Sequence, residues 1–149
     1  MQRLGVRNRF VELNVMFYFG THTTDFKIEN HINSRYGFKA LFFTNNIELA
    51  ELFANYHAKK NNQKKGYVYK ADFIRIDHNV DFNGHISHSS TFRNLIYNLQ
   101  SKFFKVVQIK NVYDYPSDEL KKFINSDIVI VFDFNFINKI EYVKEIIIK

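Results

Sequence analysis

The sequence predicts a single domain of mixed α+β class. Segments typical of strands outnumber segments with helical spacing, and the two kinds do not alternate strictly, which disfavours a doubly wound parallel sheet. No repeat, proline-rich linker or change of composition divides the 149 residues, and 46% of them are hydrophobic. We therefore expect one globular domain spanning residues 1–149.

The first third of the chain is predicted to form two strands around a short helix. The apolar run Val15 to Phe19 is typical of a buried strand, and Gly20 ends it at a turn where the backbone passes close to another part of the protein. A short helix is expected to begin near Asp25 and to end at Gly37. The second strand follows from Phe38 to Thr44.

A longer helix is predicted directly after this strand. Asn45 is the expected N-cap, and Glu48 stands three residues later, as in a capping box. The following residues on one face recur at helical spacing: Ile47, Ala50, Phe53 or Ala54, and His57 or Ala58.

The middle of the chain is predicted to hold a long strand, a polar loop and a second helix. Side chains alternate in character from Gly66 to Ile76, as in a strand with two different faces. Asp77 to His88 is mostly polar and is interpreted as a loop. Ser89 to Phe104 carries an apolar stripe at helical spacing and is predicted to be a helix.

The last third is predicted to consist mainly of strands. Three apolar segments are typical of strands: Lys105 to Ile109, Asp127 to Phe134 and Ile140 to Ile148. A short helix is expected between the first two, at Ser117 to Ile124.

The composition excludes several kinds of chemistry. The chain has no cysteine, so disulfides, thiolate zinc sites and a cysteine nucleophile are ruled out. Residues 1–15 carry several charges and lack the apolar run of a signal peptide, and no stretch approaches the roughly 20 apolar residues that span a bilayer. We expect a soluble, cytoplasmic protein with no membrane partner.

The net charge of +6 favours anionic partners, such as a dinucleotide, a nucleic acid or an acidic protein surface. Part of this charge lies in one lysine-rich run, Lys59 to Lys65, which is more often a solvated loop than a binding patch.

Other sites are weakly indicated or absent. Five residues within one polar stretch have side chains that bind metals, but their spacing matches no known ligand pattern, so no metal is expected: Asp77, His78, Asp81, His85 and His88. The chain also lacks a glycine-rich phosphate loop and a serine nucleophile elbow.

Four segments, in order along the chain, carry a resemblance to a known family. The first, Phe17-Tyr18-Phe19-Gly20-Thr21, is similar to the Tyr-His-Gly-Thr turn of the ADP-ribosyltransferase superfamily, in which the backbone and the His hold NAD. Phe19 stands where the family has His, and its ring has no hydrogen-bond donor, whereas His22 follows three residues later. The resemblance assigns cofactor contact to Tyr18, Phe19, Gly20, Thr21 and His22.

The second segment, Phe42-Phe43-Thr44-Asn45-Asn46 and the helix after it, resembles the family's strand-to-helix region in which aromatic residues sandwich the nicotinamide ring. The resemblance assigns Phe43 and Phe53 to the two sides of this ring, since a cationic nicotinamide is attracted to an aromatic face. Thr44 is expected to brace the site by hydrogen bonding. The alternative is that Phe43 and Phe53 only pack in the core.

The third and fourth segments lie in the last third of the chain. Gln108 to Asp114 resembles an Ile-Lys-Asn-Val-x-Asp stretch that is frequent in phage-type members, and we assign it a structural role. Ser126 to Asp133 is similar to the family's late strand, which begins at an acidic catalytic residue, usually Glu. Asp127 is the best positional match, and Glu119 is the substitute. Alternatively, Asp127 is a strand cap or a loop residue.

The resemblance implies an ADP-ribosyltransferase-like fold, a split mixed or antiparallel β-sandwich with flanking helices. It also implies a glycosyltransferase of the pentosyl class that uses NAD as co-substrate and transfers ADP-ribose to a macromolecular acceptor, a protein or a nucleic acid. Asp127 or Glu119 would stabilise the positive charge that forms on the ribose as nicotinamide leaves. The likeness to phage and mobile-element members implies an effector or toxin that acts on host defence or other components in the host cytoplasm.

Two other functions stay open at this point. Phe19 and Asp127, in place of the family's His and Glu, favour a degenerate member of the fold that acts as a binding or inhibitory module. The basic charge and the aromatic residues of the Tyr67 to Phe73 strand favour a nucleic-acid-binding protein.

Overall fold

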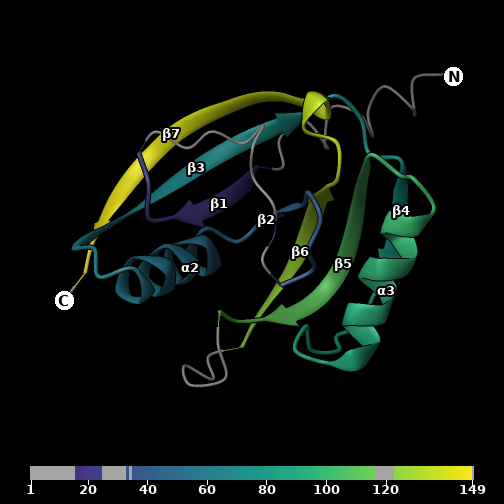
Figure 1. The fold of residues 1–149 in the computed structure, drawn as a ribbon. Coiled ribbons are helices and arrows are strands. Elements are labelled where there is room, and N and C mark those ends of the chain that lie inside the picture. The colour runs from purple at the N-terminus through teal and green to yellow at the C-terminus, as the bar shows by residue number, and fades with distance from the viewer. Residues whose placement is uncertain (1–15, 25–32, 34, 117–122, 149) are drawn as a thin grey trace, which may run out of the picture.

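The computed structural model describes residues 16–24, 33, 35–116 and 123–148, which form an α+β domain (Figure 1). The described helices are α2 (Ile47–Lys60), α3 (Ser90–Ser101) and the 3₁₀ turn η2 (Phe134–Phe136). The described strands are β1 (Phe17–Thr21), β2 (Leu41–Thr44), β3 (Lys65–Phe73), β4 (His78–Asp81), β5 (Val106–Asp114), β6 (Ile124–Val131) and β7 (Ile137–Ile147). The predicted α+β class is confirmed.

All these strands belong to one mixed sheet, in the order β4-β5-β6-β2-β1-β3-β7. Only β4 and β5 are parallel among the described neighbours. The sheet divides in its middle, because β1 and β2 are joined at the single residue pair Tyr18 and Thr44, whereas β1 follows β3 from Phe17 to Thr21. Strand pairing between the two halves is therefore limited to this pair.

The two main helices cover different halves of the sheet (Figure 1). α2 packs on β1 and β3. α3 places Phe92, Ile96 and Leu99 against the inward residues of β5 and β6. No described helix has both the length and the hydropathy that crossing a membrane requires.

Close approach of α2 to the sheet depends on two glycines. A Cβ atom at Gly20 would lie 2.0 Å from the carbonyl oxygen of Ala50, and one at Gly66 would lie 2.7 Å from that of Ala54. Both distances are far below van der Waals contact, so only glycine fits at these positions. The predicted close backbone approach at Gly20 is confirmed, although Gly20 lies within β1 rather than in a turn.

The predicted cap of α2 was wrong by one residue. Asn46 is the N-cap, and its Oδ1 accepts a hydrogen bond from the Leu49 N–H at 3.1 Å. The side chain of Asn45 is engaged elsewhere, because its Oδ1 accepts from the Asp127 N–H at 2.9 Å. Asn45 therefore ties the end of β2 to β6.

The predicted loop at Asp77 to His88 contains a strand, β4, at the edge of the sheet. Its residues are mostly exposed and polar, so they carry no apolar alternation that would have revealed it. Its pairing with β5 comes from the backbone. The helix predicted near Asp25 lies mainly outside the described residues, as does most of the one at Ser117 to Ile124, whose last residue begins β6.

The boundaries of several strands also differ from prediction. β5 continues to Asp114 rather than ending near Ile109, and β6 begins at Ile124, so Asp127 lies inside a strand and not at its start. β5 contains a bulge between Ile109 and Val112, where Asn111 takes a positive φ of 61°. The bulge changes which face of the sheet the later side chains of β5 point to.

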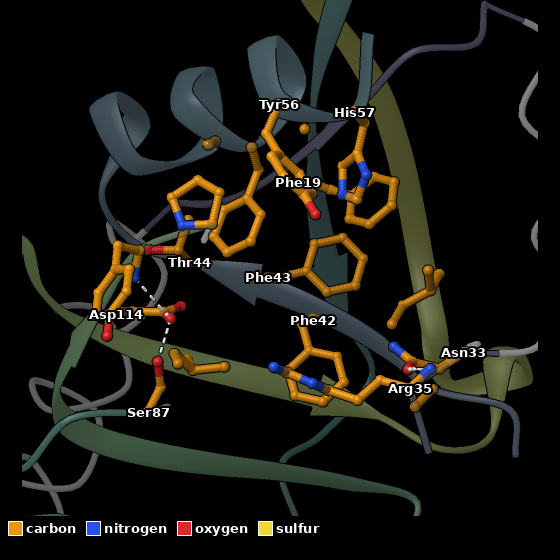
Figure 2. A pocket seen from close by; sticks show the side chains of 18 of the residues that line it. Phe19, Asn33, Arg35, Phe42, Phe43, Thr44, Tyr56, His57, Ser87 and Asp114 are labelled. Atoms are coloured by element: carbon orange, nitrogen blue, oxygen red, sulfur yellow. Dashed lines mark hydrogen bonds between the residues drawn. The ribbon is translucent and has the colours of Figure 1, made fainter. Parts of the chain in front are cut away.

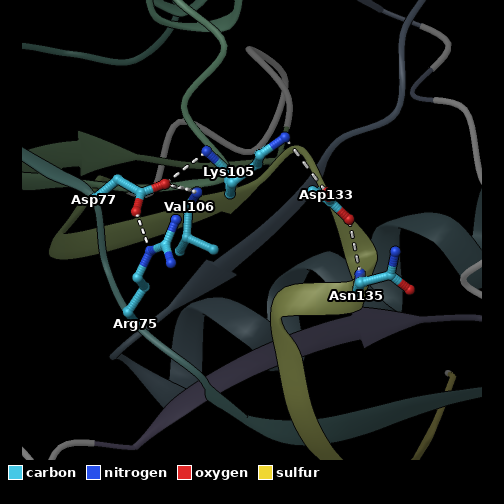
Figure 3. Close-up of polar contacts among 6 residues, drawn as sticks. All are labelled: Arg75, Asp77, Lys105, Val106, Asp133 and Asn135. Carbon is cyan, nitrogen blue, oxygen red and sulfur yellow. Dashed lines mark hydrogen bonds and ion pairs between the residues drawn. The ribbon is translucent and has the colours of Figure 1, made fainter.

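A polar clasp holds the connection between β3 and β4 to the start of β5 (Figure 3). One oxygen of Asp77 accepts hydrogen bonds from the N–H groups of Lys105 and Val106 at 2.7 and 3.3 Å, and the other accepts from Arg75 Nε at 2.6 Å. Burial alone raises the pKa of Asp77, but these donors outweigh it and bring the pKa below its ordinary value. Lys105 extends the clasp through an ion pair with Asp133 at 3.6 Å.

Candidate functional site

A cavity of about 480 Å³ lies between β1, β2 and α2, beside the point where the sheet divides (Figure 2). Its walls come from β1, from β2 and the segment before it, and from one face of α2. The start of α3 with the residues before it, the end of β5 with the residues after it, and Ile128 of β6 complete them. Its size lies in the range of small-molecule sites, about 300–1,000 Å³. The division between β1 and β2 thus produces a concave site rather than a continuous sheet surface.

Aromatic rings dominate this cavity. In Figure 2, Phe19, Tyr56 and His57 lie on the side of α2, while Phe42 and Phe43 extend from β2. The rings contributed by β1, β2, α2 and the segment before β2 are Tyr18, Phe19, Tyr36, Phe42, Phe43, Phe53 and Tyr56. Such a lining suits a flat, unsaturated ligand.

The two predicted nicotinamide neighbours differ in their surroundings. Phe43 is 1% exposed, and its ring contacts those of Phe73 and Phe19 at centroid distances of 5.1 and 5.7 Å, so it contributes mainly to the core. Phe53 is half-buried on α2 and stacks near His57 at 6.2 Å. Both line the cavity, but Phe53 has the more accessible ring.

The other predicted cofactor residues divide into two groups. Tyr18, Phe19, Gly20 and Thr44 line the cavity, whereas Thr21 and His22 do not. The Thr44 hydroxyl accepts a hydrogen bond from the Asn46 N–H at 3.1 Å, so it braces the start of α2. Thr21 is buried at the end of β1.

Of the two predicted catalytic acids, the one that the structure describes, Asp127, does not line the cavity. Asp127 lies in the middle of β6, and its Oδ1 accepts a hydrogen bond from the Asn111 N–H at 3.0 Å. Its neighbour Ile128 lines the cavity, and successive residues of a strand point to opposite faces. Glu119 lies outside the described residues.

A different carboxyl group, that of Asp114, lines the cavity. It is 9% exposed and accepts hydrogen bonds from the Ser87 hydroxyl and from the Tyr115 N–H, the latter at 2.9 Å. Burial raises the pKa of Asp114, while these two donors and the charges of His88 and Arg35 act in the opposite direction without cancelling it. The sequence had indicated only a structural role for this segment.

Ser87 reaches Asp114 because the chain before α3 runs beside the end of β5. Ile86 forms an isolated parallel bridge with Tyr113, and the Ser87 N–H donates to the Tyr113 carbonyl at 2.9 Å. The next residue, His88, stacks on Tyr115 at 4.1 Å. Asp114 is therefore held in a fixed setting by backbone and ring contacts from two segments.

Cationic side chains lie at the margin of the cavity. Arg35 and Lys60 line it and are exposed, and Lys60 Nζ lies 5.9 Å from the centre of the Tyr56 ring. In Figure 2, the backbone positions of Arg35 and Asn33 lie on one side of Phe42, and Ser87 and Asp114 lie on the other side. The site thus combines an aromatic interior with cations that suit an anionic group.

The histidine-rich segment does not assemble a metal site within the described part of the chain. No described cluster of three His, Asp or Glu side chains has a metal-binding arrangement. Asp77 belongs to the clasp at β5, and the His78 ring stacks on Phe104 at 4.8 Å. His88 is the member of this segment that lies at the cavity.

Comparison of the chain with protein-family models, with curated proteins and with solved structures finds no match.

Proposed function

We propose that this chain binds NAD in the cavity between β1, β2 and α2 and transfers ADP-ribose to a macromolecular acceptor. One observation carries the proposal: the segments Tyr18 to Gly20 and Phe42 to Thr44 line the same cavity together with Phe53. These are the segments to which the resemblance assigns NAD contact. The divided sheet is in keeping with the split sandwich that an ADP-ribosyltransferase-like fold requires.

The charges of the cavity suit the charges of NAD. Its aromatic rings offer negative faces to the cationic nicotinamide, and Arg35 and Lys60 offer positive charge to the pyrophosphate. In the transfer, the bond between ribose C1′ and the nicotinamide nitrogen breaks, and its electron pair leaves with nicotinamide. The acceptor nucleophile then forms the new bond to C1′ and releases its proton to solvent.

The acceptor class is proposed from sequence properties alone. A net charge of +6 favours an acidic protein surface or a nucleic acid. A role as a phage or mobile-element effector in the host cytoplasm rests on the resemblance described above.

Calorimetric titration with NAD, followed by chromatography for released nicotinamide, tests this function. NAD is expected to bind, and labelled ADP-ribose is expected to appear on a protein or nucleic-acid fraction of a cell lysate. Phe53→Ala should weaken NAD binding by about fivefold, since a stacked aromatic ring contributes about 1 kcal/mol. Phe103→Ala removes an identical side chain that is 83% exposed and does not line this cavity, so it is the matched control. Absence of NAD binding would overturn the proposal.

A second function is favoured by the position of Asp127. Its carboxylate accepts a hydrogen bond at the β5 bulge and does not line the cavity. This position favours a module that binds NAD or a partner without transferring ADP-ribose. The same titration separates the two functions, because such a module binds NAD yet releases no nicotinamide.

A further inference from the structure

The buried carboxyl group of Asp114 has no role in the function proposed from the sequence. It lines the same cavity as the aromatic rings and is 9% exposed. The Ser87 hydroxyl and the Tyr115 N–H donate hydrogen bonds to it, and no lysine or arginine in the described part of the chain forms an ion pair with it. Burying a carboxylate without a cation is unfavourable.

Aromatic faces gather near this acid. Tyr36 stacks on Phe42 with a centroid distance of 5.7 Å and an interplanar angle of 16°, and both line the cavity with Asp114. Burial is the main cause that raises the pKa of Tyr36; the charges of Arg35 and Arg93 lower it, and Tyr97 and then Asp114 add smaller raising effects. Aromatic faces beside a carboxylate form a site for a flat cation, because both attract positive charge.

We propose that Asp114 makes this cavity selective for a cationic heteroaromatic ring, so that it prefers oxidised nicotinamide to the neutral, reduced form. The identity of the ring rests on the proposed NAD function, whereas the preference for a flat cation rests on Asp114 and the surrounding rings. A bound cation adds positive charge beside Asp114, where the charges of His88 and Arg35 do not cancel the effect of burial. A neutral ring of the same shape adds none.

Two small probes isolate this effect from the rest of NAD. 1-Methylnicotinamide carries the positive ring charge, and nicotinamide is its neutral counterpart. Wild-type protein should bind the cation more tightly than the neutral probe, and NAD more tightly than NADH. Asp114→Asn should weaken binding of the cationic probe by about tenfold, the effect of about 1.4 kcal/mol, and leave binding of nicotinamide almost unchanged.

Matched variants separate charge from structure. Asp72→Asn makes the same change at an exposed position on β3, so it should preserve the preference. Ser87→Ala removes the hydroxyl bonded to Asp114 but keeps the negative charge, so it should also preserve the preference. Thermal unfolding of each variant verifies that it is folded.

The pH dependence supplies a second readout. Affinity for the cation should rise as Asp114 ionises, and this rise should vanish in Asp114→Asn. Arg35, His88 and Tyr36 also face Asp114. His88→Asn keeps the Asp114 carboxyl group and should retain the rise.

The outcomes distinguish this inference from the NAD function. Equal weakening of both small probes by Asp114→Asn, or no weakening of either, overturns the inference even if NAD binds. Selective binding of 1-methylnicotinamide with no binding of NAD supports it and overturns the NAD function instead.

Discussion

The carboxylate of Asp127 accepts a hydrogen bond from the backbone N–H of Asn111 at 3.0 Å, at the bulge where β5 carries one residue more than β6. Before the bulge, Val107 and Ile109 point into the core. After it, Val112 and Asp114 are the buried residues. A shift of one residue exchanges the two faces of a strand, so the bulge turns Asp114 toward the cavity. Asp127 thus supports the orientation of Asp114 from outside the cavity.

Substitutions at Asp127 should reveal this structural role. Asp127→Ala leaves the Asn111 N–H without its acceptor and should lower the free energy of unfolding by about 1–2 kcal/mol. Asp127→Asn keeps an acceptor oxygen and should cost less than half of that. Urea denaturation of both variants measures the difference.

Activity assays on the same pair then test whether Asp127 is also catalytic. Loss of nicotinamide release in Asp127→Asn, with stability retained, would assign it a chemical role. Equal stability of Asp127→Ala and the wild type would contradict the structural role.

The same bulge explains why the candidate site was only partly predictable. Strand alternation counted from Val107 and Ile109 predicts that Asn111 and Tyr113 point inward and Asp114 outward. No local residue pattern indicates the extra residue of the bulge. Tyr18, Phe43 and Phe53 were assigned to the site by the resemblance, and apolar runs and helical spacing place them on two strands and a helix that line the cavity. β4 was not, since its exposed polar residues owe their extended form to pairing with β5.

The contact between Gly20 and α2 leads to a second prediction. Gly20→Ala would place a Cβ atom 2.0 Å from the Ala50 carbonyl oxygen and 2.7 Å from the Ala54 nitrogen, both of which are backbone atoms. The helix must move, so we expect a loss of about 2–3 kcal/mol in stability and weaker binding in the cavity. Thermal unfolding and the NAD titration measure the two effects.

Gly37→Ala is the control for this change. Its Cβ atom meets nothing within 4 Å, so only its φ of 79° opposes the substitution, at a cost of about 1 kcal/mol. Similar losses in the two variants would show that contact with α2 is unimportant.

The clasp at Asp77 predicts a loss of stability in acid. Its pKa is lowered in the folded protein, so its contribution is fully present above the ordinary value of about 4 and is lost as the pH falls through the folded value. Asp77→Asn should lower stability by about 1–2 kcal/mol at neutral pH, because an amide cannot accept the donors on both sides. The difference from the wild type should shrink below about pH 4. Urea denaturation across this range measures it, and a constant difference would exclude the charge of Asp77 as its cause.

Asp114 should show the opposite dependence on pH. Its pKa is raised, so between the ordinary value of about 4 and the folded value the folded protein holds a proton that the unfolded chain has lost. Stability due to this group is therefore present at low pH and is lost as the pH rises through the folded value. Asp114→Asn keeps an oxygen to accept from Ser87 and Tyr115 and removes the buried charge, so it should be more stable than the wild type at neutral pH. Denaturation curves should converge toward about pH 4. If Asp114→Asn is more stable but binds the cationic probe more weakly, the buried charge is maintained for binding at the expense of stability. If Asp114→Asn is less stable than the wild type at every pH, Asp114 contributes to packing alone.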